Sequence, residues 1–204
     1  MIGIFLAFSC ASGATVLGNE ILTLNLRDVP ESDKLLSTRY LDREGFYSLR
    51  PLAGFKKDAT MPRGGKTDPL RYRVRFKQPS TGDVVEAGVG VSEVKSLDKV
   101  SLSRLRGDLM AGLRQKKGFQ VVGSELFLYD RYTCLQVVAR GGGQVILLVL
   151  MFEQPGEFLE ITYSIGERRY PLLSRQVEAS IATVEWPDMA GTSAVKEAEK
   201  SGQK

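Results

Sequence analysis

Thiols and clustered carboxylates are the side chains of this sequence with the most evident capacity for chemistry. The chain has two cysteines, Cys10 and Cys134, and three glutamates, Glu153, Glu157 and Glu160, stand around a Pro-Gly pair. Cys134 lies in an apolar stretch, which is typical of a small buried hydrophobic residue rather than of a reactive thiol. The spacing of the glutamates matches no calcium-binding loop, so solvated charge is favoured over an acid/base pair or a metal site.

Histidine is absent from the 204 residues. Its absence removes the commonest general base, the nucleophile pairs that depend on it and the usual zinc ligand. Catalysis by carboxylates or by Cys134 stays open, so an enzyme is kept as an alternative class of function. The residue set predicts a non-enzymatic protein with no catalytic residue, no metal site and no cofactor.

Basic side chains concentrate in one segment. Residues 56–77 contain eight Lys or Arg and two Asp, whereas the whole chain has a net charge of only +4. Within Leu70–Lys77 apolar and basic residues alternate strictly, which predicts a half-buried strand with its bases on one face. These bases are Arg71, Arg73, Arg75 and Lys77.

Two interpretations of this basic face stay open. Arginine pairs well with carboxylates and phosphates, so the face is predicted to dock an acidic protein or lipid headgroups. Alternatively, the charges keep a solvated face or an edge strand from aggregating. Tyr72 and Phe76 are expected to point to the opposite face from the bases, so a nucleic-acid partner is not predicted.

The N-terminal segment indicates where the chain is expected to act. Residues 1–18 are apolar or small, no base precedes Arg27, and Cys10 follows a hydrophobic run. This pattern predicts an export signal with Cys10 as a lipid attachment site. Ordinary cleavage near Ala14, an uncleaved membrane anchor and a buried N-terminal element stay open as alternatives. The expected location is the periplasmic side of the bacterial cell envelope, in association with the membrane.

Hydrophobic periodicity predicts an α+β fold, in which one antiparallel β-sheet packs with two long helices as an α/β/α sandwich. The first helix is predicted near residues 98–117, capped by Asp98 or Ser101, and the second at Tyr170–Glu185. Strands are predicted in a hairpin with its turn at Glu44-Gly45, and at Leu70–Lys77, Val84–Val94, Phe119–Val122, Glu125–Asp130, Tyr132–Arg140, Gln144–Glu153 and Phe158–Ser164.

The predicted elements fall into one domain at residues 39–186, preceded by a connector at residues 19–38. The run Val145–Phe152 is apolar without alternation, which predicts a strand buried on both faces. Residues 187–204 are small and charged, and are predicted to form a disordered tail.

One stretch resembles a known family. Gly45–Phe55 reads Gly-Phe-Tyr-Ser-Leu-Arg-Pro-Leu-Ala-Gly-Phe, and resembles the glycine, aromatic, serine, apolar, proline, glycine, aromatic signature that opens PsbP-like domains. The order of a long helix, a strand meander and a closing helix is similar to the PsbP and DcrB-type fold, over residues 39–186. The resemblance implies an envelope-facing domain, often a lipoprotein, with assembly or accessory roles and no shared catalytic residue.

These observations favour a membrane-tethered accessory or docking domain that binds another envelope protein or complex through Arg71, Arg73, Arg75 and Lys77. A lipid or small-ligand carrier is the alternative. Its pocket would lie between the sheet and a helix. The residues expected to line that pocket are Phe127, Tyr129, Tyr132 and Phe158.

Overall fold

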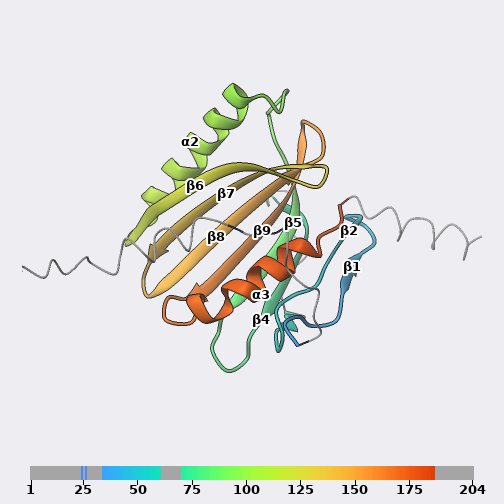
Figure 1. Ribbon diagram of the computed structural model, residues 1–204, viewed down its shortest axis with the longest axis vertical. Helices are drawn as coiled ribbons and strands as arrows, with labels where there is room; N and C mark the ends of the chain where they lie inside the picture. The colour runs from blue at the N-terminus through green and yellow to red at the C-terminus, as the bar shows by residue number, and fades with distance from the viewer. Residues whose placement is uncertain (1–23, 25, 27–33, 61–69, 187–204) are drawn as a thin grey trace, which may run out of the picture.

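The computed structural model describes Leu24, Leu26 and residues 34–60 and 70–186. Within these residues, a seven-stranded antiparallel sheet has the order β3-β4-β5-β9-β8-β7-β6, and β1 and β2 form a separate two-stranded sheet (Figure 1). The predicted α+β class is confirmed. The elements are β1 (Tyr40–Asp42), β2 (Tyr47–Leu49), β3 (Lys56–Lys57), β4 (Leu70–Lys77), β5 (Val84–Val91), α2 (Lys99–Gln115), β6 (Phe119–Tyr129), β7 (Tyr132–Gly141), β8 (Gln144–Phe152), β9 (Glu157–Gly166) and α3 (Tyr170–Ala182).

The two helices cover opposite faces of the large sheet (Figure 1). α2 packs mainly on β6 and β7, where its Leu102 and Leu113 join one apolar cluster. α3 lies on the other face beside the β1–β2 hairpin, and its Val177 and Ile181 join a second, larger cluster. β8, at the centre, is buried on both faces from Val145 to Phe152, which confirms the prediction from its unbroken apolar run. Neither α2 nor α3 is both long and apolar enough to cross a membrane.

Local signals set the start of α2. Asp98 is its N-cap, and its carboxylate accepts a hydrogen bond from the backbone N–H of Ser101 at 2.8 Å. Of the two predicted caps, Asp98 is therefore the one used. The cap satisfies one of the N–H groups that the first turn of a helix leaves without a partner.

The end of α3 differs from the prediction, because the helix stops at Ala182 and not at Glu185. Residues after it pair with β2 instead. The N–H of Ser48 donates to the carbonyl of Glu185 at 2.9 Å, and the N–H of Glu185 donates back to Ser48 at 3.1 Å. A strand-like bridge to the hairpin therefore replaces the last helical turn.

Two further elements differ from the prediction. The two strands predicted around Gly123 are one strand, β6, because a register shift between Val121 and Gly123 absorbs an extra residue without ending the pairing. No strand was predicted at the position of β3. β3 pairs through Lys56 and Lys57 with the end of β4, at the sheet edge.

A buried carboxylate ties three segments together at one end of the sheet. Asp83, which follows the β4–β5 turn, is only 3% exposed. Its oxygens accept hydrogen bonds from Arg169 Nε at 2.7 Å, from the Gly166 N–H at 2.8 Å and from the Thr81 hydroxyl at 2.8 Å. Burial alone raises the pKa of this carboxyl, but these bonds outweigh burial and hold the pKa below its usual value of 3.8.

We expect Asp83→Asn to lower the free energy of unfolding by about 1–3 kcal/mol at pH 7, because Arg169 and Gly166 lose a charged acceptor. Because the folded-state pKa is depressed, the contribution of Asp83 is complete above pH 3.8 and is lost as pH falls through the folded-state pKa. Urea unfolding at pH 7 and at pH 3 checks this: the difference from the unaltered chain shrinks at pH 3. Asp108→Asn, at an exposed site, is the control and leaves stability unchanged.

Candidate functional site

β4 contains a bulge that breaks the predicted alternation. Its register with β5 shifts after Arg71, and Tyr72 has a left-handed backbone with a φ of 53°. Arg71 pairs with Val89, on the face that α3 covers, whereas Arg75 pairs with Glu86, on the face of α2. Because residues paired across strands share a face, the extra residue turns Arg71 away from the bases that follow it.

The prediction that four bases share one face is therefore wrong for Arg71. Arg73, Arg75 and Lys77 lie on the side of the sheet that carries α2. Arg71 lies on the opposite side and forms an ion pair with Glu157, with Nη2 and Oε1 2.7 Å apart. The strand thus brings together three of the four residues, and their role in partner binding stays a prediction.

A single carboxylate neutralises part of this group. Glu86 of β5 forms ion pairs with both arginines, at 3.0 Å to Arg73 and at short range to Arg75. Sequence reasoning missed Glu86, although a signal existed: Val85, Ala87 and Val89 alternate toward the core, so Glu86 had to face the other way. The two guanidinium groups are therefore held in place on the sheet by a carboxylate of the same chain.

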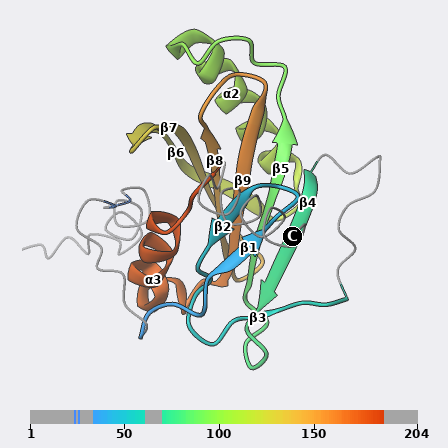
Figure 2. The ribbon, with the colours of Figure 1, turned by 90° about the vertical axis from the view of Figure 1, so that its right-hand side faces the viewer.

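The remaining positive charge lies where β3 meets β4. Lys56 stands directly opposite Lys77 in the antiparallel pair, and both are exposed. Neither makes an ion pair with any described residue. Together with Arg73 and Arg75 they form what we call the cationic edge, defined by Lys56, Arg73, Arg75 and Lys77; Figure 2 shows β3 and β4 at this side of the sheet.

Beside the cationic edge lies a second carboxylate, Glu160 of β9. Burial raises the pKa of the Glu160 carboxyl. A hydrogen bond from the Thr162 hydroxyl, with Oγ1 to Oε1 at 3.2 Å, and the charge of Arg73 oppose this rise only in part. This half of the face carries no helix within the described residues, because α2 packs on β6 and β7. A charged network on an open sheet surface suits recognition of a charged partner.

The hairpin holds the bulge in place. The Tyr47 hydroxyl donates to the backbone carbonyl of Tyr72 at 2.6 Å. Gly45 allows this contact, because a Cβ there would lie 2.8 Å from the ring of Tyr47 and 3.0 Å from the Cβ of Tyr72. Phe46 next to it also has a positive φ, of 52°. Two aromatic residues in this rare backbone region mark the hairpin–bulge contact as a locally strained junction.

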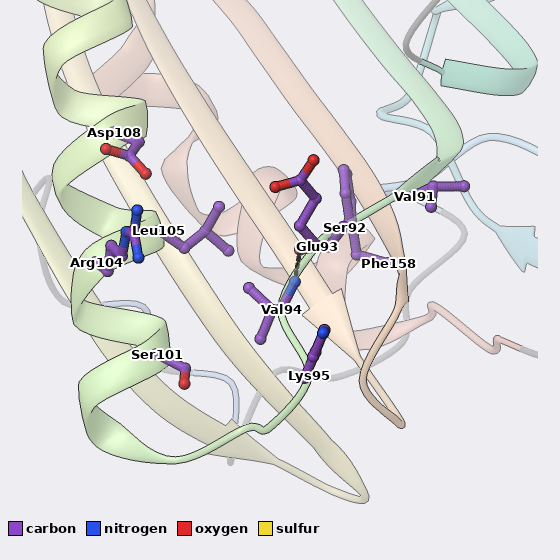
Figure 3. Close-up of a pocket in the computed structure, with 10 residues that line it drawn as sticks. All are labelled: Val91, Ser92, Glu93, Val94, Lys95, Ser101, Arg104, Leu105, Asp108 and Phe158. Atoms are coloured by element: carbon purple, nitrogen blue, oxygen red, sulfur yellow. Dashed lines mark hydrogen bonds between the residues drawn. The ribbon is translucent and has the colours of Figure 1, made fainter.

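A cavity of about 560 Å³ lies between the loop after β5 and the first half of α2 (Figure 3). Leu105 projects from α2 toward the loop, and Val94 and Phe158 complete an apolar lining. The loop is held by the Ser92 N–H, which donates to the Gly156 carbonyl at 2.8 Å. Its volume is in the range of small-molecule sites.

The aromatic residues expected to line a carrier pocket do not converge. Tyr132 is buried in the cluster on the α3 side, and Phe127 and Tyr129 pack against the same cluster. Phe158 lies on the α2 side and is the one of the four that borders the cavity. The expected lining was therefore wrong, because three of these side chains belong to the opposite face of the sheet.

Cys134 is a buried residue with an inert thiol. It is 1% exposed within the larger apolar cluster. Burial raises the pKa of this thiol to about 12, although a backbone hydrogen bond opposes the rise. At neutral pH the thiolate is therefore scarce, as the sequence predicted for a small hydrophobic residue. Cys10, the predicted lipidation site, lies outside the described residues.

The fold defines an antiparallel α+β sandwich, and this sandwich is PsbP-like. The solution structure of cyanobacterial PsbP (CyanoP) from Synechocystis sp. PCC 6803 matches with a TM-score of 0.54 and 16% identity, covering 74% of this chain and 92% of that chain. A crystal structure of a protein from Bacteroides thetaiotaomicron VPI-5482 matches with a TM-score of 0.43 and 11% identity, and the match covers 74% of this chain and 48% of that chain. No protein-family model and no curated protein matches the chain. The predicted PsbP-like fold is confirmed, whereas the DcrB-type likeness stays a prediction.

The surroundings of two glycines predict opposite effects when each is replaced by alanine. A Cβ at Gly90 would overlap the ring of Phe158, whereas a Cβ at Gly112 of α2 meets open space. We expect Gly90→Ala to lower the free energy of unfolding by about 1–3 kcal/mol through overpacking. Gly112→Ala should raise it by about 0.5–1 kcal/mol, because alanine favours the helix. Urea unfolding of both variants measures this, and a neutral Gly90→Ala would contradict the placement of Phe158.

Proposed function

We propose that the chain is a membrane-tethered, non-enzymatic accessory domain of the bacterial cell envelope, acting on the periplasmic side. It docks onto an acidic surface of another envelope protein or complex through the cationic edge. The tether is the N-terminal segment, with Cys10 as the lipidated residue. Arg71, paired with Glu157 on the other face, is not part of this docking surface.

The observation that carries the proposal is the juxtaposition of Lys56 and Lys77. Like charges directly opposite each other on neighbouring strands destabilise a sheet. The two lysines and the arginines beside them carry four positive charges, which the neighbouring carboxylates of Glu86, Asp58 and Glu160 offset only in part. An acidic partner surface removes this repulsion on binding, so the energetic cost in the free chain becomes a gain in the complex.

The fold supports the same class of function. The resemblance at Gly45–Phe55 implies an accessory role, and the PsbP-like fold of the chain is consistent with that role. The part of β4 after the bulge also fits docking, because Val74 and Phe76 are buried in the core while Lys77 remains exposed at the surface. The ion pairs with Glu86 hold the two arginines of this surface in fixed geometry.

Reversal of the two lysines tests the docking surface. The double variant Lys56→Glu/Lys77→Glu keeps two like charges opposite each other, so the fold experiences a similar repulsion with the sign inverted. We expect the tagged full chain with these changes to recover its partners from native membranes roughly tenfold less well, or worse. Quantitative mass spectrometry of the co-purified proteins measures the loss.

Lys99→Glu/Lys117→Glu changes the net charge by the same amount at two exposed positions at the ends of α2; this double variant is the matched control and should retain every partner. Retention of all partners by the Lys56→Glu/Lys77→Glu variant, at unchanged chain abundance, contradicts docking through the cationic edge. Equal losses from the Lys56→Glu/Lys77→Glu variant and from the control variant contradict it as well, because they point to net charge alone.

A further inference from the structure

The cavity beside α2 has charged groups of both signs around an apolar lining. Glu93 and Lys95 come from the loop after β5, and Arg104 and Asp108 come from α2 (Figure 3). Each side of the cavity thus contributes one acid and one base. Leu105, Val94 and Phe158 form the apolar part of the lining.

These four charged side chains do not stabilise the fold through polar contacts with other described residues. Within the described part of the chain, none of them forms an ion pair or a side-chain hydrogen bond. Arg104 and Asp108 stand four residues apart on the helix, a spacing at which opposite charges can pair, yet they do not. Elsewhere on the surface Arg71 and Arg131 do pair with carboxylates.

We propose that this cavity binds a short peptide of two to four residues with free termini and apolar side chains. The peptide ammonium lies at Glu93 and Asp108, and its carboxylate lies at Lys95 and Arg104. An apolar side chain packs on the lining that Leu105 provides. The volume of about 560 Å³ accommodates a ligand of this size.

The balance of charge favours a peptide over a lipid. An anionic headgroup would meet Glu93 and Asp108 together with the two bases, which cancels most of its attraction. The apolar lining is short, with Leu105, Val94 and Phe158 as its main members, whereas an acyl chain needs a much longer apolar surface. A zwitterion with a compact apolar body satisfies both the charges and the lining.

This site is independent of the docking function proposed above. It uses none of the residues of the cationic edge, and the peptide-binding experiment requires no envelope partner. A failure of either proposal therefore leaves the other standing.

Calorimetric titration of the purified full chain with trileucine tests the proposal. We expect saturable binding, with affinity lowered about tenfold by acetylation of the peptide amine and about tenfold by amidation of its carboxylate, since each removes one charge-assisted contact. The amidated peptide should bind Arg104→Gln as tightly as it binds the unaltered chain, because an amidated peptide has no carboxylate for Arg104 to contact. Asp108→Asn should show the same pattern with the acetylated peptide.

Arg114→Gln, an exposed site in the last turn of α2, is the matched control and should leave binding unchanged. Absence of saturable heat at millimolar trileucine overturns the proposal, as does equal affinity for free and doubly capped peptide. Saturable binding of glycerophosphoethanolamine in place of trileucine also overturns it, because the zwitterion would then be a lipid headgroup. Circular dichroism confirms that each variant is folded.

Discussion

The hydrogen bond from the Tyr47 hydroxyl to the carbonyl of Tyr72, at 2.6 Å, fixes the surface chemistry of this protein. It ties the β1–β2 hairpin to the β4 bulge, where the backbone of Tyr72 takes a conformation that costs a non-glycine residue about 1–3 kcal/mol. Without the extra residue, Arg71 would stand on the side of α2. With the extra residue, Arg71 lies on the opposite side, and the three bases that follow Arg71 in the strand lie on the same side as Lys56.

Two glycines of β5 organise the rest of this face. Gly88 leaves room for the stem of Arg73, and Gly90 leaves room for the ring of Phe158. Both side chains therefore lie across β5, one leading toward the cationic edge and the other toward the cavity beside α2. The two glycines of β5 therefore lie between two surfaces of different character. The surface at β3 and β4 is positively charged, whereas the surface at α2 has balanced charges and an apolar lining.

Features with local causes were predictable from the sequence, and features with distant causes were not. The Asp98 cap, the helix after it and the buried β8 follow from neighbouring residues, and the structure confirms them. The bulge has no local signal, because Leu70–Lys77 alternates perfectly and its break depends on Tyr47, 25 residues earlier. The early end of α3 likewise depends on Ser48, which pairs with Glu185 from a distant strand.

Under the proposed function, Lys56 and Lys77 contact a partner while the chain is tethered to a membrane. Acetylation footprinting compares the labelling rate of each lysine in intact membranes with its rate in the purified chain. The account predicts slower labelling of Lys56 and Lys77 in membranes, while Lys117 labels at the same rate in both. Equal rates for all three lysines in the two settings would contradict the account.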